Sequence, residues 1–276
     1  MKIRNMRHLA AIPAGLVVWA TSAVAMAAPK AWEAPHDASE HGHNIDWLIN
    51  ITNLFSAVLF AIMCFIMISA FIKHGKKHSA EYDTGDGKNA VMMAMAISAV
   101  IFVIVDGNLF VNSTKDVFGT FWNFEKVDKD PQTLKVEVQG RQWMWQMRLA
   151  GKDGKFNTSD DALSDHELVV PVNTPVLLQL ASPDVIHTFA LPHFRIKQDA
   201  MPGMINLMWF QGKEEGEFPI VCVQNCGANH YQMAGTLKVV SKEAFDEWVE
   251  LKVRDSEAVW DEKDAEAHWG WAWKKI

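Results

Sequence analysis

Two cysteines, a histidine and a methionine lie within twelve residues of one another near the end of the chain. They are Cys222, Cys226, His230 and Met233, and their spacing is C-x3-C-x3-H-x2-M. Thiolate, imidazole and thioether are soft ligands, and soft ligands select copper over the hard cations. The glycine after Cys226 favours a tight loop, because glycine tolerates backbone conformations that other residues resist. This stretch therefore predicts a loop that binds copper.

The number of cysteines limits which kinds of metal site the chain can form. A zinc knuckle needs a second cysteine pair or two histidines, and the chain has three cysteines in all. A blue-copper site uses one cysteine, two histidines and a weak axial methionine, so it would leave one thiolate unused. Two bridging thiolates with one histidine for each metal would hold two coppers close together. A disulfide between Cys222 and Cys226 is the alternative in an oxidising compartment, but it leaves His230 and Met233 unexplained.

A binuclear site needs a second histidine, and His187 is the candidate. It follows an apolar strand candidate over residues 176–180 and precedes a turn that contains Pro192. A structural histidine is the alternative at this position; beside the cysteine loop, we interpret His187 as a ligand. Residues 218–221 and 236–240 have the pattern of strands, so the loop lies between two strands. Rigid scaffolds commonly present their chemistry on such loops.

Four pieces of the sequence resemble subunit II of the haem–copper cytochrome c oxidases. In chain order they are Gly140-Arg-Gln-Trp-Met-Trp145, Asp184-Val-Ile-His187, Lys197-Gln-Asp-Ala-Met-Pro-Gly203 and the loop from Cys222 to Met233. The resemblance covers about residues 45–240 and implies a binuclear copper centre of the CuA type. In it, the cysteines bridge the coppers, each histidine binds one copper, and a thioether and a backbone carbonyl are weak axial ligands. The implied ligands are His187, Cys222, Gln224 through its carbonyl, Cys226, His230 and Met233.

The resemblance also implies a role for Trp143, which would receive the electron from cytochrome c. Tryptophans at this spacing usually pack in a core, and core packing is the alternative. Trp143 and Trp145 are two positions apart, so in a strand they would share one face.

Two regions of the sequence bear on the binding of other cations, calcium and magnesium. Residues 153–161 carry alternating oxygen-bearing side chains around a glycine, a pattern similar to a calcium loop, although the spacing is not that of an EF-hand. A polar turn is the alternative there. In the family, a glutamate at the position of Gln224 commonly helps to hold magnesium. A neutral carboxamide is a weaker ligand for that hard cation, so magnesium is left open.

Two apolar stretches precede the copper region. Residues 47–72 carry no charge and exceed the roughly 20 residues that span a bilayer. Residues 90–111 form a second span, interrupted late by Asp106, which we interpret as an interfacial or subunit-contact residue rather than part of a proton path. The loop at residues 73–88 is rich in lysine, and the positive-inside rule places it in the cytoplasm. We therefore expect a transmembrane helical hairpin over residues 47–112.

The start of the chain has the pattern of an exported protein. Residues 1–27 read as a secretory signal, with a basic start, a short apolar stretch and small-x-small cleavage candidates. A retained third membrane helix is the alternative. Residues 28–46 then form a polar, exported N-terminal segment.

The region after the hairpin changes character. Over residues 127–240, short strand candidates punctuated by proline and glycine predict a β-sandwich or barrel, and the resemblance implies an all-β, cupredoxin-like Greek-key domain. Residues 241–252 predict a capped amphipathic helix with Phe245, Trp248 and Leu251 facing inward. A charged, tryptophan-rich tail then runs to residue 276.

The net charge of −7 argues against nucleic-acid binding, because proteins that bind nucleic acid carry a basic patch that attracts the phosphates.

The resemblance implies the subunit through which electrons enter a respiratory terminal oxidase. It would accept them from cytochrome c at CuA and pass them to haem in catalytic subunit I, in a complex with other oxidase subunits. The implied location is a bacterial-type inner membrane, multi-pass, with the CuA domain on the periplasmic side. The equivalent subunit of a copper-containing nitric oxide reductase and a membrane-tethered copper chaperone are the alternatives.

Overall fold

The computed structural model describes residues 34–75, 79, 82, 84–261, 263, 271, 273 and 274. The predicted signal segment at residues 1–27 lies outside them, as do parts of the predicted cytoplasmic loop and of the tail. Residues Asp37–Ile276 form one compact unit, and the contacts described below all lie within it.

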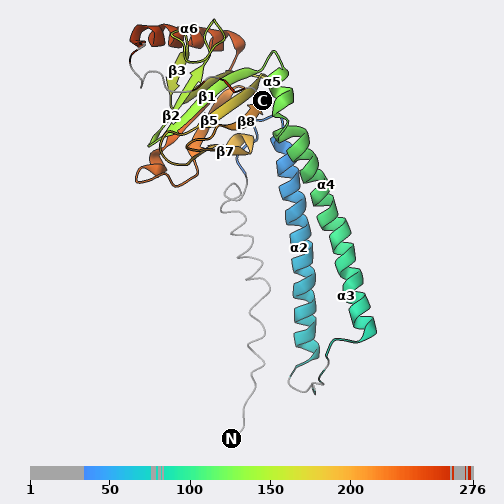
Figure 1. Ribbon diagram of the computed structural model, residues 1–276. Coiled ribbons are helices and arrows are strands. Elements are labelled where there is room, and N and C mark those ends of the chain that lie inside the picture. The colour runs from blue at the N-terminus through green and yellow to red at the C-terminus, as the bar shows by residue number, and fades with distance from the viewer. Residues whose placement is uncertain are drawn as a thin grey trace, which may run out of the picture. The chain divides into compact units, whose positions relative to one another are not determined.

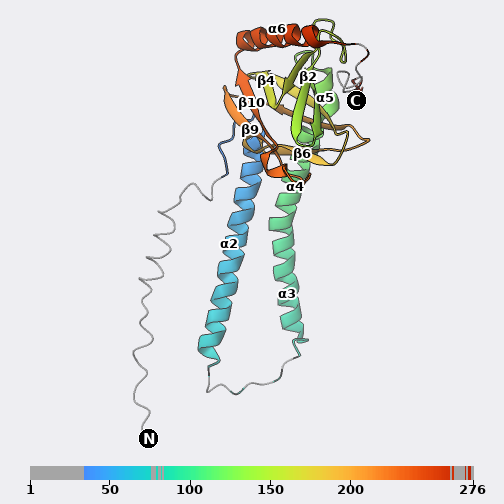
Figure 2. The same ribbon diagram turned by 90° about the vertical axis from the view of Figure 1, so that its left-hand side faces the viewer.

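Two long helices open the described part of this unit (Figure 1). The first, α2 (Gly42–Lys73), contains the first predicted span. The second runs through α3 (Lys88–Ile101), the π-helical segment η1 (Phe102–Asp106), α4 (Gly107–Asp116) and the π-helical segment η2 (Val117–Phe121), and α5 (Phe124–Lys129) follows. Both helices are long and apolar enough to cross a membrane. Figures 1 and 2 show α2 beside α3 and α4.

The second helix continues past residue 111, where we expected the span to end. Its side chains turn polar over residues 112–116, and polarity ends an apolar span. Polarity does not end a helix, however, and no proline or glycine stands in that stretch to break it. Asn44 on α2 donates to Asp116 at 3.1 Å, so the polar extension of the second helix packs against the start of the first.

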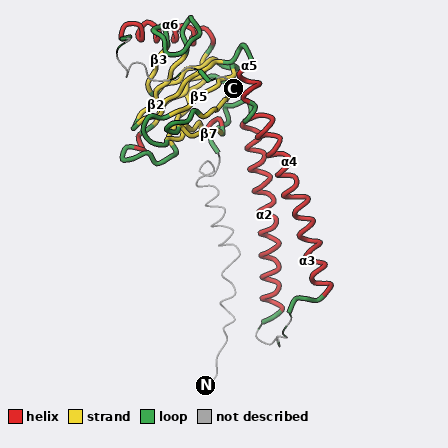
Figure 3. Tube along the Cα trace, in the orientation of Figure 1, coloured by secondary structure: helices red, strands yellow, loops and turns green. Residues whose placement is uncertain are grey.

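Ten strands follow in the described chain, and Figure 3 shows them gathered into one β domain. They form two five-stranded sheets, with the orders β3-β2-β1-β5-β8 and β4-β10-β9-β6-β7. The strands are β1 (Leu134–Arg141), β2 (Met144–Leu149), β3 (Ala162–Asp165), β4 (Glu167–Pro171), β5 (Pro175–Ala181), β6 (His187–Leu191), β7 (Ile196–Ala200), β8 (Asn206–Gln211), β9 (Gly216–Cys222) and β10 (Ala234–Val240).

The two sheets form the β-sandwich that the sequence led us to expect. Strands β1 and β5 are parallel, as are β4 and β10, and these pairs join segments that are distant in the sequence. Alternation along β1 sends Val136 and Val138 into the core, with Glu137 on the opposite face of the sheet. Trp145 packs edge-on against Phe189 with ring centroids 5.1 Å apart, so the core reaches β6, where His187 begins the strand.

The predicted C-terminal helix is α6 (Lys242–Val259), which is longer than we expected. Ser241 caps it, since its hydroxyl accepts the N–H of Ala244. Phe245 is buried as expected, but the inward orientation of Leu251 was wrong, because its side chain is 51% exposed. Val253 is buried instead, since two helical turns after Phe245 bring it back to the inner face.

The connection between the helices and the β domain is made by charged and aromatic groups. Arg195 follows the short helix η3 (Pro192–Phe194), and its guanidinium donates to both carboxylate oxygens of Asp46, at 2.7 and 2.9 Å. The indole N–H of Trp209 donates to the Thr120 carbonyl at 2.9 Å. These contacts tie both long helices to the sheets that carry the site.

The outer face of the first sheet is covered by the end of the chain. Gln179 on β5 is fully buried, and its amide oxygen accepts the indole N–H of Trp271 at 2.9 Å and the backbone N–H of Lys274 at 3.2 Å. Its amide nitrogen donates to the Lys274 carbonyl at 2.8 Å. Trp273 stacks on Phe156 with ring centroids 5.2 Å apart. These described residues of the tail therefore pack on their own β domain.

The loop in which we considered calcium has the hydrogen bonding of a polar turn. Asp161 accepts the backbone N–H groups of Asn157 and Thr158, at 2.7 and 3.2 Å. The Asp160 carboxylate accepts the N–H of Asp153 at 3.2 Å. Calcium binding by residues 153–161 stays a prediction.

Candidate metal centre

The register of the second sheet brings His187 to the cysteine loop. Strands β6 and β9 are antiparallel neighbours, and Phe189 pairs with Cys222. The backbone N–H of Val223 donates to the Thr188 carbonyl, and that of Cys222 donates to the Met233 carbonyl, both at 3.1 Å. The start of β6 and both ends of the loop are thus held together by backbone hydrogen bonds.

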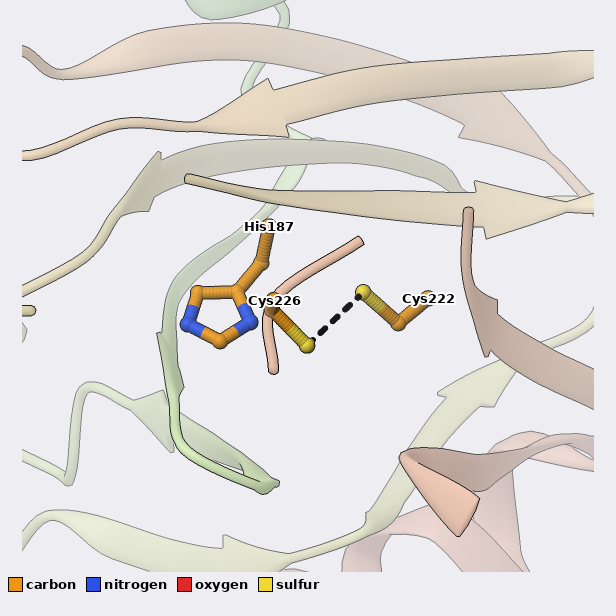
Figure 4. Close-up of side chains that lie close together, drawn as sticks. All are labelled: His187, Cys222 and Cys226. Atoms are coloured by element: carbon orange, nitrogen blue, oxygen red, sulfur yellow. Dashed lines mark hydrogen bonds between the residues drawn. The ribbon is translucent and has the colours of Figure 1, made fainter. Parts of the chain in front are cut away.

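The two thiols are close but not bonded (Figure 4). Their sulfur atoms are 3.8 Å apart, whereas a disulfide bond is about 2.05 Å long. A ring nitrogen of His187 and the sulfurs of Cys222 and Cys226 all lie within 4.8 Å of one another. Metal–thiolate bonds are about 2.3 Å long, so one ion can reach both sulfurs.

The other residues named from the sequence lie around this trio. Met233 Sδ is 3.1 Å from His187 Nδ1 and 3.7 Å from Cys226 Sγ. His230 Nδ1 is 3.6 Å from Cys226 Sγ, and the Gln224 carbonyl is 3.3 Å from Cys222 Sγ. The fold therefore gathers all six candidate ligands at one place. His187 is fully buried and Met233 is 2% exposed, so water has little access to the middle of the cluster.

Asp184 orients the imidazole of His187. The Asp184 carboxylate lies 2.9 Å from His187 Nε2, which leaves Nδ1 to face the sulfurs. Burial alone would raise the pKa of Asp184, but hydrogen bonds from the Gln142 N–H and the His187 ring outweigh it and lower the pKa to about 2. A histidine that binds metal commonly donates its second N–H to such a carboxylate. The sequence places Asp184 in a motif but does not show that it contacts the His187 ring, because no local pattern shows which way its carboxylate points.

The two thiols differ in acidity. Burial acts to raise the pKa of Cys222, but the His187 ring and the Thr188 backbone N–H outweigh it and lower the pKa below the ordinary value. Burial and the neighbouring Cys222 thiolate raise the pKa of Cys226. Burial also opposes the charged form of His187, yet its contacts with Cys222 and Asp184 raise its pKa. Cys222 is thus the more acidic of the two thiols, and both thiols must lose their protons if both sulfurs bind metal.

Trp143 lies beside the cluster, but not on a strand. Strand β1 ends at Arg141 and β2 begins at Met144, so Trp143 is in the turn between them. The prediction that Trp143 and Trp145 share a strand face was therefore wrong, because a turn breaks the alternation. Trp145 is fully buried, with its ring edge-on to His187 at 6.0 Å. Trp143 is half-buried, and its indole N–H donates to the Cys226 carbonyl at 3.3 Å.

Most of the β domain matches a family model. Residues 152–240 match the family model described as the periplasmic domain of cytochrome c oxidase subunit II. The alternative cytochrome c oxidase subunit 2 of Bradyrhizobium diazoefficiens is 29% identical over 231 residues, which are 75% of this chain and 79% of that protein. Cytochrome c oxidase subunit 2 of Cereibacter sphaeroides is 33% identical over 147 residues, 42% of this chain and 48% of that protein.

The similar proteins also include solved structures, and one of them is an oxidase domain. It is the periplasmic domain of subunit II of the cytochrome oxidase of Bradyrhizobium japonicum, with 31% sequence identity. The alignment covers 44% of this chain and 94% of that chain, with a TM-score of 0.40.

Proposed function

We propose that this chain, whose β domain is of the cytochrome c oxidase subunit II family, accepts electrons for a respiratory haem–copper oxidase. The observation that carries the proposal is the pair of free thiols 3.8 Å apart, with His187 Nδ1 turned toward the sulfurs by Asp184. Two thiols held at this distance suit a pair of soft metal ions better than one hard cation.

The donor set fits two coppers. Cys222, Cys226, His187 and His230 would hold them through their sulfur and nitrogen atoms. Met233 and the Gln224 carbonyl would be additional, weaker ligands. A copper pair, when bound, supplies a one-electron site in which the charge is shared over two metals, so each bond changes little on reduction.

The residues of the chain itself have three tasks in this proposal. Asp184 holds the His187 ring in the orientation that a ligand needs. Burial of His187 and Met233 keeps water from the metals, which favours a rigid site. Trp143, hydrogen-bonded to the Cys226 carbonyl, would receive the electron from cytochrome c at the protein surface.

The same proposal includes the membrane in which the chain would lie and the oxidase complex to which it would belong. The two apolar helices would cross the bacterial inner membrane and leave the β domain in the periplasm. The electron would pass on to haem in catalytic subunit I, which would also carry the oxygen chemistry. A nitric oxide reductase could use the same subunit, and the sequence of the partner subunit separates these two cases. A copper chaperone is disfavoured, since its ligands must be accessible for exchange while His187 is fully buried.

The test is electron paramagnetic resonance of the full chain in detergent, loaded with copper. We expect hyperfine structure from one electron shared equally by two coppers. Cys226→Ser should abolish that pattern. Cys64→Ser, which changes the one cysteine outside the cluster, should leave it intact. A spectrum of separate mononuclear coppers in the unmodified chain would contradict the proposal.

A further inference from the structure

Gln142 makes two hydrogen bonds at the edge of the candidate metal centre. Its side-chain amide donates to the Cys226 carbonyl at 2.7 Å. Its backbone N–H donates to Asp184 Oδ2, also at 2.7 Å. Gln142 therefore fastens the turn that carries Trp143 both to a cysteine of the loop and to the carboxylate that orients His187.

The hydrogen bonds form a chain between the two ligand-bearing segments. It runs from His187 through Asp184 to the backbone of Gln142, and from the Gln142 side chain to Cys226. The indole N–H of Trp143 donates to the same Cys226 carbonyl, at the longer distance of 3.3 Å. Of the two donors to that oxygen, Gln142 has the shorter hydrogen bond and so holds the turn more firmly.

Close packing supports the same contact. Gly227 has a φ of +120° and lies against the turn. A Cβ added there would come within 2.9 Å of the Gln142 amide nitrogen and 3.2 Å of the Trp143 ring. The glycine thus lets the turn approach the peptide between Cys226 and Gly227 as closely as the hydrogen bonds require.

We propose that Gln142 is a positioning residue for electron acceptance, and that it holds the Trp143 indole against the Cys226 carbonyl. This inference rests on the proposed function and adds a residue to it. One electron would leave the ferrous haem of cytochrome c and arrive at the metal pair, while Trp143 ends unchanged. A bonded route from the indole to the Cys226 sulfur crosses the Trp143 hydrogen bond and the backbone of Cys226. Gln142 would contact neither cytochrome c nor the metal pair. It would act only by fixing the position of the Trp143 side chain.

The experiment uses the full chain, loaded with copper in detergent, and ferrous cytochrome c as the donor. Gln142→Met keeps the size of the side chain but removes the donor. We expect the rate of copper reduction in stopped flow to fall about fivefold, the population shift that loss of one ordinary hydrogen bond produces. The paramagnetic resonance spectrum and the midpoint potential should not change, because no ligand is altered. Gln132→Met, at an exposed glutamine in another turn, should change nothing.

A double-mutant cycle tests whether Gln142 acts through Trp143. In a Trp143→Phe background, where the indole N–H is absent, Gln142→Met should add no further loss of rate. A full additional loss there, an unchanged rate in the single variant, or an altered copper spectrum would each overturn the inference. If the unmodified chain lacks the binuclear signal, the proposed function itself fails, and the two failures are thus distinguishable.

Discussion

Glu137 and Arg148 face each other across β1 and β2, and neither side chain is exposed to solvent. A guanidinium nitrogen of Arg148 lies 3.6 Å from the Glu137 carboxylate, and Arg148 Nε lies 3.2 Å from Asp161. Two buried carboxylates therefore share one cation. Asp161 is closer and also accepts two backbone N–H groups, so Glu137 is the one that holds a proton more readily.

This arrangement predicts that the stability contributed by Glu137 falls as pH rises. Burial outweighs the attraction of Arg148 and raises the pKa of Glu137 from 4.5 to about 8. Between these values the folded chain keeps a proton that the unfolded chain has lost. The stability that this proton contributes is fully present at low pH and declines through this window, by up to about 1.4 kcal/mol per pH unit. Thermal unfolding of the full chain in detergent across this range measures the slope.

Glu137→Gln should remove this contribution, so the stability of the variant should fall less with rising pH than that of the unmodified chain. Glu167→Gln is the matched control, since Glu167 pairs with Lys238 at the surface. It should keep the slope of the unmodified chain. A slope that is unchanged in Glu137→Gln would show that another group causes it.

A methyl group added at Gly140 should disturb the candidate metal centre by pressing on Trp145 and His187. An added Cβ would lie 2.8 Å from the Trp145 ring and 3.2 Å from the His187 side chain. Gly140→Ala should lower the free energy of unfolding by about 1–3 kcal/mol, the usual cost of overpacking, and should weaken copper binding by moving His187. Copper titration followed by its absorption measures the affinity. Gly119→Ala, where an added Cβ meets nothing within 4 Å, should leave copper binding unchanged.

Met233→Leu should change the reduction potential without removing the copper pair. Leucine fills the buried position with a similar volume but offers no thioether. Loss of a weak electron-donating ligand destabilises the oxidised form more than the reduced form, so the midpoint potential should rise. Redox titration of the copper-loaded chain measures it. Met204→Leu, at an exposed methionine, should leave the potential where it was. A fall in potential would contradict a ligand role for Met233.

Gln179→Leu should release the C-terminal tail from the β domain. The substitution removes the acceptor of Trp271 and Lys274 and the donor to the Lys274 carbonyl. Each lost hydrogen bond costs about 0.5–1.5 kcal/mol, so the tail should be trimmed faster by carboxypeptidase. Mass spectrometry at timed intervals follows the trimming. Equal rates in Gln179→Leu and in the surface variant Gln132→Leu would mean that the tail is held by other contacts.

Strands β5, β9 and β10 could be predicted because their local pattern is strong. Strand β10 alternates and β5 is apolar apart from Gln179, and both were found within a residue or two of their bounds. Trp143 shows where such reasoning fails, since a two-residue turn between strands looks like part of a longer strand. Leu251 shows a related failure, because a short apolar pattern fits more than one helical face until the partner surface is known.

The sequence by itself determined the chemistry of the donors. Thiolates, imidazoles and a thioether at close spacing favour copper whatever the fold, because ligand softness belongs to the side chains. Only the tertiary structure decided how they meet. Pairing of β6 with β9 brings His187 to a loop far along the chain, and strand register depends on long-range packing. The roles inferred for Asp184 and Gln142 arise in the same way, from hydrogen bonds between segments that no local pattern connects.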